Sequence, residues 1–225
     1  MTIATMALDP LKGKAESKQA QTIHPIDKTD RLVEVIHAWE SDYGNRYLFG
    51  EPKIPVLNPN QIEFVLDDII EHRKYDTKGF FNIGRFISRL MQQSYDEGFN
   101  HFKLGTTKIS IWLEDMSLPY LCTNLGGSKK RPIYVEVYAR AGDYFGNDCS
   151  HLDAKVERSG NALGQRTYKC NFRVELLKNF SANNIEGCKF YTSQESTFEM
   201  LSTKLTSEYG RIGNYWQGNK VILVQ

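Results

Sequence analysis

The sequence lacks most of the features that announce a function at once. Its four cysteines form no C-x-x-C pair, and a chain of 225 residues can build a core without disulfide bonds, so we expect reduced thiols at Cys122, Cys149, Cys170 and Cys188. No apolar run approaches the roughly 20 residues that span a membrane, and the first 30 residues hold no apolar signal segment. We therefore predict a cytoplasmic protein with no membrane contact.

Net charge is also nearly absent. The chain has 28 Lys and Arg against 27 Asp and Glu, which leaves a formal net charge of +1. Because long-range attraction of nucleic acid or acidic substrates requires an excess of positive charge, any such partner must bind to a local basic patch.

Familiar catalytic and cofactor-binding motifs are missing as well. There is no G-x-S-x-G nucleophile elbow, no phosphate-binding glycine loop, and no zinc-finger or RNP pattern. Cys149 and His151 alone lie close enough in sequence to share a metal or to act as thiolate and base. These absences favour a protein that binds, with an enzymatic role as the alternative.

The apolar pattern that is present predicts the fold. A period of about 3.6 residues indicates helices, and a period of 2 indicates strands. We expect helices over residues 30–44, 61–75 (capped by Asn60), 82–96 and 194–210, and strands over residues 108–115, 131–140, 152–158, 166–176 and 187–193. The loops between strands are too short for a crossover helix, which favours antiparallel pairing.

We therefore predict an α+β fold in which N-terminal helices pack on one face of a mostly antiparallel sheet, followed by a late helix and a C-terminal β-hairpin. Gly218 and Asn219 are suited to the hairpin turn between Tyr215 and Val224. Residues 1–28 have no apolar period and are expected to be a flexible tail. Residues 29–225 are expected to form a single domain, and no internal repeat is visible.

The segment "HLDAKVE" holds an Asp-x-Lys triplet, Asp153 and Lys155, ten residues after Asp143. This arrangement resembles the PD-(D/E)xK class of nucleases, although Gly142 stands where that class has proline. The resemblance implies that Asp143 and Asp153 bind Mg²⁺ while Lys155 orients the attacking water. Alternatively, Asp153 and Lys155 are two charges on the solvent face of a sheet, where opposite charges on neighbouring strands stabilise the fold. We favour the second interpretation.

Two basic clusters are candidate partner-binding sites. Lys129, Lys130 and Arg131 precede Tyr134 and Tyr138 on a predicted strand, and cations beside aromatic rings suit nucleic acid. Arg85 and Arg89 are four residues apart and share a helix face, which could clamp a phosphate or an acidic group.

These features predict a non-catalytic binding or assembly subunit that contacts a protein or nucleic-acid partner. The apolar "KVIL" segment near the C-terminus must be covered by the fold or by another chain, which makes a protein partner or a homo-oligomer the first expectation. The alternative is a Mg²⁺-dependent nuclease built on Asp143, Asp153 and Lys155. No other cofactor is expected.

Overall fold

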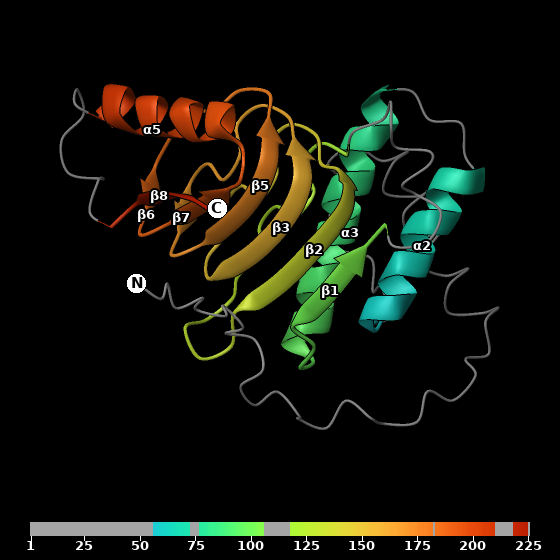
Figure 1. The fold of residues 1–225 in the computed structure, drawn as a ribbon. Coiled ribbons are helices and arrows are strands. Elements are labelled where there is room, and N and C mark those ends of the chain that lie inside the picture. The colour runs from blue at the N-terminus through green and yellow to red at the C-terminus, as the bar shows by residue number, and fades with distance from the viewer. Residues whose placement is uncertain (1–55, 73–76, 106–117, 182, 210–217, 225) are drawn as a thin grey trace, which may run out of the picture.

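The computed structural model describes residues 56–72, 77–105, 118–181, 183–209 and 218–224 (Figure 1). It contains the helices α2 (Pro59–His72), α3 (Thr77–Asp96) and α5 (Glu195–Tyr209). Its strands are β1 (His101–Leu104), β2 (Ile133–Arg140), β3 (Leu152–Ser159), β4 (Thr167–Tyr168), β5 (Asn171–Leu177), β6 (Ile185–Glu186), β7 (Lys189–Thr192) and β8 (Lys220–Leu223). The tail, the helix over 30–44 and the strand over 108–115 that the sequence predicts lie outside the described residues.

The predicted helices within the described residues are confirmed, although α3 begins at Thr77, before its predicted start at residue 82, and the start of α2 differs as well. Asn58 Oδ1 accepts a hydrogen bond from Gln61 N at 3.0 Å, and Asn58 N donates to Gln61 Oε1 at 2.8 Å. This reciprocal capping box satisfies two backbone N–H groups, so Asn58 is the cap and Asn60 lies inside the helix. None of the described helices is long and apolar enough to cross a membrane.

The main sheet is parallel throughout, so the predicted antiparallel α+β sheet is wrong. Its strand order is β1-β2-β3-β5-β7-β8, and every neighbouring pair is parallel. Strand β8 pairs in parallel with β7, and the first arm of the predicted C-terminal hairpin lies outside the described residues. The architecture is therefore closer to α/β than to antiparallel α+β.

Short connections can join parallel strands here because each connection stacks on the next one. We call the stretches outside the main sheet that lead from one of its strands to the next the return segments. In them, Tyr120 N donates to Asp143 O at 2.8 Å and Tyr144 N donates to Asn161 O at 2.8 Å. Strands β4 and β6 form a second parallel pair in the same way. The chain thus winds as a solenoid in which each strand and each return bonds to the equivalent segment of the next turn.

The solenoid has a structural repeat that the sequence displays only weakly. Asp153 lies opposite Asn171, 18 residues later, and Asn171 lies opposite Lys189. The corners recur as well, since Asp148, Arg166 and Asn184 all have left-handed backbones, with φ of 56°, 52° and 53°. Gly146 and Gly164 recur at the same spacing, but the corners hold Asp, Arg and Asn, so the similarity along the sequence is weak.

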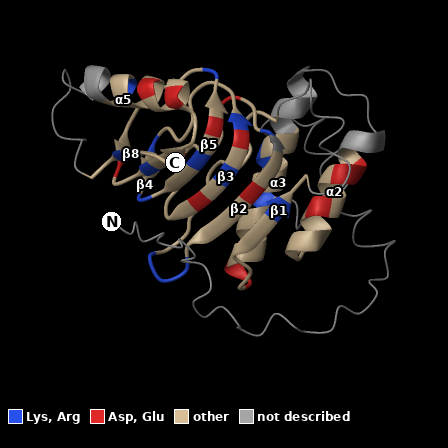
Figure 2. Ribbon diagram, in the orientation of Figure 1, with Lys and Arg blue, Asp and Glu red and all other residues tan. Residues whose placement is uncertain are grey.

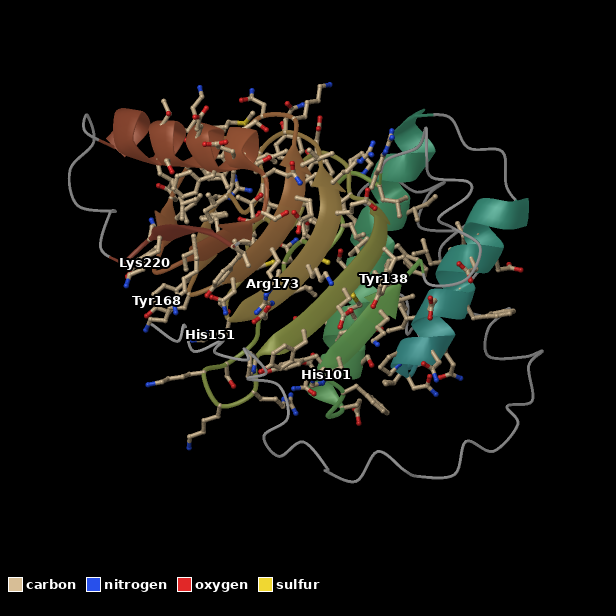
Figure 3. The ribbon with its side chains drawn as sticks, in the orientation of Figure 1. His101, Tyr138, His151, Tyr168, Arg173 and Lys220 are labelled. Atoms are coloured by element: carbon tan, nitrogen blue, oxygen red, sulfur yellow. The ribbon has the colours of Figure 1, made fainter. Side chains whose placement is uncertain are left out.

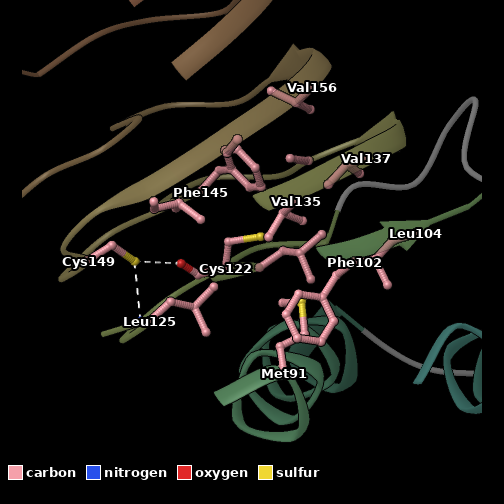
Figure 4. Packing of buried hydrophobic residues seen from close by; sticks show 14 of the residues in the cluster. Met91, Phe102, Leu104, Cys122, Leu125, Val135, Val137, Phe145, Cys149 and Val156 are labelled. Atoms are coloured by element: carbon pink, nitrogen blue, oxygen red, sulfur yellow. Dashed lines mark hydrogen bonds between the residues drawn. The ribbon is translucent and has the colours of Figure 1, made fainter. Parts of the chain in front are cut away.

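The hydrophobic core fills the space between the inner face of the sheet and the returns (Figure 4). Phe172 is fully buried and its ring stacks on Phe190 at a centroid distance of 5.4 Å. Gly146 and Gly164, with φ of 68° and 64°, bring the returns against the Phe172 ring. In Figure 1, α2 and α3 lie at the β1 end of the sheet and α5 lies at the β7 and β8 end.

Candidate binding surface on the outer sheet face

The strand residues that point away from the core form a polar and charged surface, which we call the outer face. An all-parallel sheet is usually covered on both faces by apolar packing, so a charged outer face is unusual. Buried and accessible residues alternate along β1, β3, β5 and β7, as expected for strands with one face in the core. Figure 3 shows the side chains of this face, including the labelled His101, Tyr138, Arg173 and Lys220.

The parallel register aligns these residues in two rows across the strands. The first rung consists of His101, Tyr134, Asp153, Asn171, Lys189 and Lys220. The second rung consists of Lys103, Glu136, Lys155, Arg173, Tyr191 and Ile222. Neighbouring members of a rung lie on strands about 4.8 Å apart.

On part of the outer face, charged side chains lie beside side chains of opposite charge. Glu136 lies opposite both Lys103 and Lys155, which places opposite charges side by side. Asp153 forms an ion pair with Arg173 and accepts a hydrogen bond from Asn171 Nδ2 at 3.3 Å. Asp153 is therefore bound to the next strand, as the charged-face interpretation expects.

Two rung contacts instead bring like charges together. Lys155 lies directly opposite Arg173, and Lys189 lies directly opposite Lys220. Like charges in this position destabilise a sheet. Arg173 is compensated by Asp153, whereas Lys189 and Lys220 form no ion pair within the part of the chain that the structure describes.

Aromatic side chains are interspersed with the charges. His101 stacks on Tyr134 at a centroid distance of 4.5 Å, and partial burial lowers the pKa of His101 below its ordinary value. A lowered pKa favours the neutral ring, which can stack on Tyr134 without the cost of burying a charge. Tyr138, which is 43% exposed, donates from its hydroxyl to Glu136 Oε2 at 2.5 Å.

The first predicted basic cluster is divided by the structure. Lys129 and Lys130 are exposed in a turn closed by reciprocal backbone hydrogen bonds of 3.1 Å between Ser128 and Arg131. Figure 2 shows this basic loop beside the N-terminal end of β2. The Arg131 guanidinium donates to Tyr95 O at 2.7 Å and lies 4.0 Å from the Tyr95 ring centroid, so it attaches the turn to α3.

The second predicted cluster does not join the outer face. Arg85 and Arg89 lie on α3, the helix that packs against the first return segment. The Arg85 guanidinium lies 4.2 Å from the ring centroid of Tyr120, which stacks on Tyr144 of the next turn. Both basic clusters were predicted as partner-binding sites from the sequence, but in the structure they lie on different elements and do not form one surface.

The residues of the nuclease hypothesis are not brought together. Asp143 follows the C-terminal end of β2, and its Oδ1 accepts hydrogen bonds from Asn161 N at 2.7 Å and from Asn161 Nδ2 at 3.0 Å. Asp153 lies opposite Tyr134 at the other end of β2. The intervening strand spans roughly 20 Å at about 3.3 Å per residue, whereas two ligands of one Mg²⁺ each lie about 2.1 Å from it.

The cysteines have structural positions in the core. All four are free and buried. The Cys149 thiol donates to Cys122 O at 2.8 Å, and burial raises the pKa of Cys149 to about 12 (Figure 4). In this protonated, hydrogen-bonded form the Cys149 thiol is neither a nucleophile nor a metal ligand. Among the described residues, no group of three or more His, Cys, Asp or Glu could hold a metal ion.

Comparisons of the chain with family models, with curated proteins and with solved structures found no match.

The sequence interpretation missed Lys189 and Lys220 as candidate binding residues. They are 31 residues apart in the sequence and become neighbours only through the parallel pairing of β7 and β8. Each begins a short strand of alternating or apolar character, "KFYT" and "KVIL". A lysine at the first position of both strands was the one available signal.

Proposed function

We propose that the chain is a non-catalytic binding or assembly subunit that contacts its partner through the outer face. One observation carries the proposal. The outer face is a broad polar sheet surface with exposed Lys103, Lys155, Lys189 and Tyr138, in an architecture whose other sheet face is the hydrophobic core. Stacked solenoid turns commonly present such extended surfaces to partners.

The charge on the outer face favours an anionic partner. The two rungs hold the cations Lys103, Lys155, Arg173, Lys189 and Lys220, and the acids Glu136 and Asp153. Both acids are already in contact with cations or hydroxyl donors, whereas several lysines are exposed. Further along the strands acids and cations are mixed, because Glu157 and Glu175 lie there together with Arg140 and Arg158.

A single charge reversal at the centre of the outer face tests this function. The tagged chain is used to capture its partners, and bound proteins and nucleic acids are quantified by mass spectrometry and sequencing. We expect Lys155→Glu to reduce recovery of the specific partner about tenfold or more, because reversal replaces an attraction with a repulsion. Lys178, which is exposed beyond the end of β5, provides the matched control Lys178→Glu and should leave recovery unchanged.

The proposal fails if Lys155→Glu, shown to be folded by circular dichroism, captures every partner as the unmodified chain does. No contact among the described residues favours the nuclease hypothesis as a second candidate. Its own test is incubation of single- and double-stranded nucleic acid with Mg²⁺, and we expect the nucleic acid to remain intact.

A further inference from the structure

Three exposed lysines that form no ion pair among the described residues gather at one corner of the solenoid, which we call the lysine corner. It comprises Lys169, Lys189 and Lys220, all exposed and located at the N-terminal ends of β5, β7 and β8. Lys189 and Lys220 are direct register partners. Lys169 is at the preceding turn, where its Cγ lies 3.2 Å from the Cβ position of Gly187, so three successive turns each contribute one cation.

This arrangement opposes the stability of the fold. Two ammonium groups that start from strands about 4.8 Å apart repel each other, and the sheet would be more stable with an acid at one of these positions. The same sheet shows that alternative, since Glu136 separates Lys103 from Lys155. The nearest acids by register are Asp153, which is paired with Arg173, and the exposed Glu186 on the neighbouring return. An anionic ligand would remove the repulsion.

Aromatic rings adjoin the lysine corner. Tyr168 is 37% exposed, and the Lys169 ammonium lies 4.5 Å from its ring centroid. His151 meets the Tyr168 ring edge-on at 5.7 Å, and Figure 3 shows His151, Tyr168 and Lys220 in the same region. Tyr191 lies on the second rung with the Arg173 guanidinium 5.4 Å from its ring centroid. Rings and cations thus alternate around the corner.

We propose that the lysine corner, together with the adjoining edge of the outer face, binds single-stranded nucleic acid, with phosphates on the lysines and bases against Tyr168 and Tyr191. This inference rests on the proposed function and names the class of partner. Lysines attract phosphates regardless of sequence, and each base has a flat face that stacks on an aromatic ring. A duplex keeps its bases inside, and an acidic peptide or sulfated polysaccharide has no such array of flat rings.

Binding is measured by fluorescence anisotropy with labelled single-stranded RNA and DNA about 15 nucleotides long, titrated with the full chain at several salt concentrations. We expect the Lys189→Gln, Lys220→Gln double variant to bind about tenfold or more weakly. Its plot of log affinity against log salt should be shallower by about 1.4, because each phosphate contact on a single strand contributes about 0.7. Lys178→Gln is the matched control and should bind like the unmodified chain.

A second variant separates nucleic acid from other polyanions. Tyr168→Leu should weaken oligonucleotide binding at least about fivefold with an unchanged salt slope, since loss of a stacked base is not electrostatic. It should leave binding of heparin, used as the sulfated polysaccharide, unchanged. The Lys189→Gln, Lys220→Gln variant should also melt at a slightly higher temperature, because the repulsion is gone. A loss of affinity therefore cannot arise from unfolding.

The inference is overturned if the unmodified chain does not bind single strands at physiological salt, or if it binds duplex or heparin more tightly. It is also overturned if both corner variants bind normally. The two proposals can fail separately. A protein partner that is lost with Lys155→Glu and kept with the corner variants would support the binding function and reject nucleic acid as its ligand.

Discussion

Gly164→Ala is expected to lower the free energy of unfolding by about 3 kcal/mol. Gly164 has φ of 64°, a conformation that costs a residue with a side chain about 1–2 kcal/mol. A Cβ atom there would lie 2.7 Å from Phe172 Cε2 and 3.0 Å from Phe172 Cζ. The Phe172 ring is fully buried against Phe190 and cannot move away without further strain, which adds about 1–3 kcal/mol.

Urea-induced unfolding measures this loss, which corresponds to a fall in melting temperature of roughly 2–4 °C per kcal/mol for a chain of this size. The control Gly187→Ala isolates the backbone contribution, because Gly187 has the same φ of 64° and the nearest atom to its Cβ position is Cγ of the flexible, exposed Lys169 side chain, at 3.2 Å. Phe172→Leu should relieve the steric contribution, so that Gly164→Ala is less damaging in that background. A Gly164→Ala variant as stable as the unmodified chain would contradict the packing of the returns on Phe172.

Gly84→Ala in α3 is expected to destabilise the chain by about 2 kcal/mol, although alanine is the better helix former by about 1 kcal/mol. A Cβ at Gly84 would overlap Pro119 O, a backbone atom of the first return. The same contact region is held by Ser88 Oγ, which donates to Gly84 O at 2.6 Å and accepts from Thr123 N at 3.1 Å. The helix would have to move off the solenoid.

The sign of this change is the informative result, because propensity and packing predict opposite directions. Thermal and urea unfolding of Gly84→Ala should show a loss. Gly126→Ala is the control, since its Cβ position has Gln92 Oε1 at 4.0 Å as its nearest atom, and it should be close to neutral. An increase in stability for Gly84→Ala would mean that α3 does not contact the returns as described.

The elements of this fold could be predicted from local patterns, whereas their pairing could not. Strands such as Ile133–Arg140 and Leu152–Ser159 alternate apolar and polar residues, and that alternation arises whether the neighbouring strand is parallel or antiparallel. From the sequence alone, the short connections between the predicted strands favoured antiparallel pairing. They are compatible with parallel pairing here because left-handed residues at Asp148, Arg166 and Asn184 turn the chain sharply at each corner.

The candidate surface could be predicted only in part, because local patterns show which residues are accessible but not which residues lie side by side. Tyr134 and Tyr138 were placed on an accessible strand face from alternation alone, and Lys129 and Lys130 from the composition of their loop. The sequence could not show that Arg131 is attached to Tyr95, because that contact joins residues 36 positions apart. Nor could it show that Asp143 and Asp153 lie at opposite ends of a strand, since this depends on the parallel register.

Lysine footprinting tests the central claim, that the outer face is the binding surface, most directly. The chain is labelled with an amine-reactive reagent with and without the partner it captures, and modified sites are quantified by mass spectrometry. We predict that the partner protects Lys103, Lys155, Lys189 and Lys220 and leaves Lys178 and Lys204 equally labelled in both states. Protection of Lys178 and Lys204 with unchanged labelling of the outer-face lysines would contradict the account.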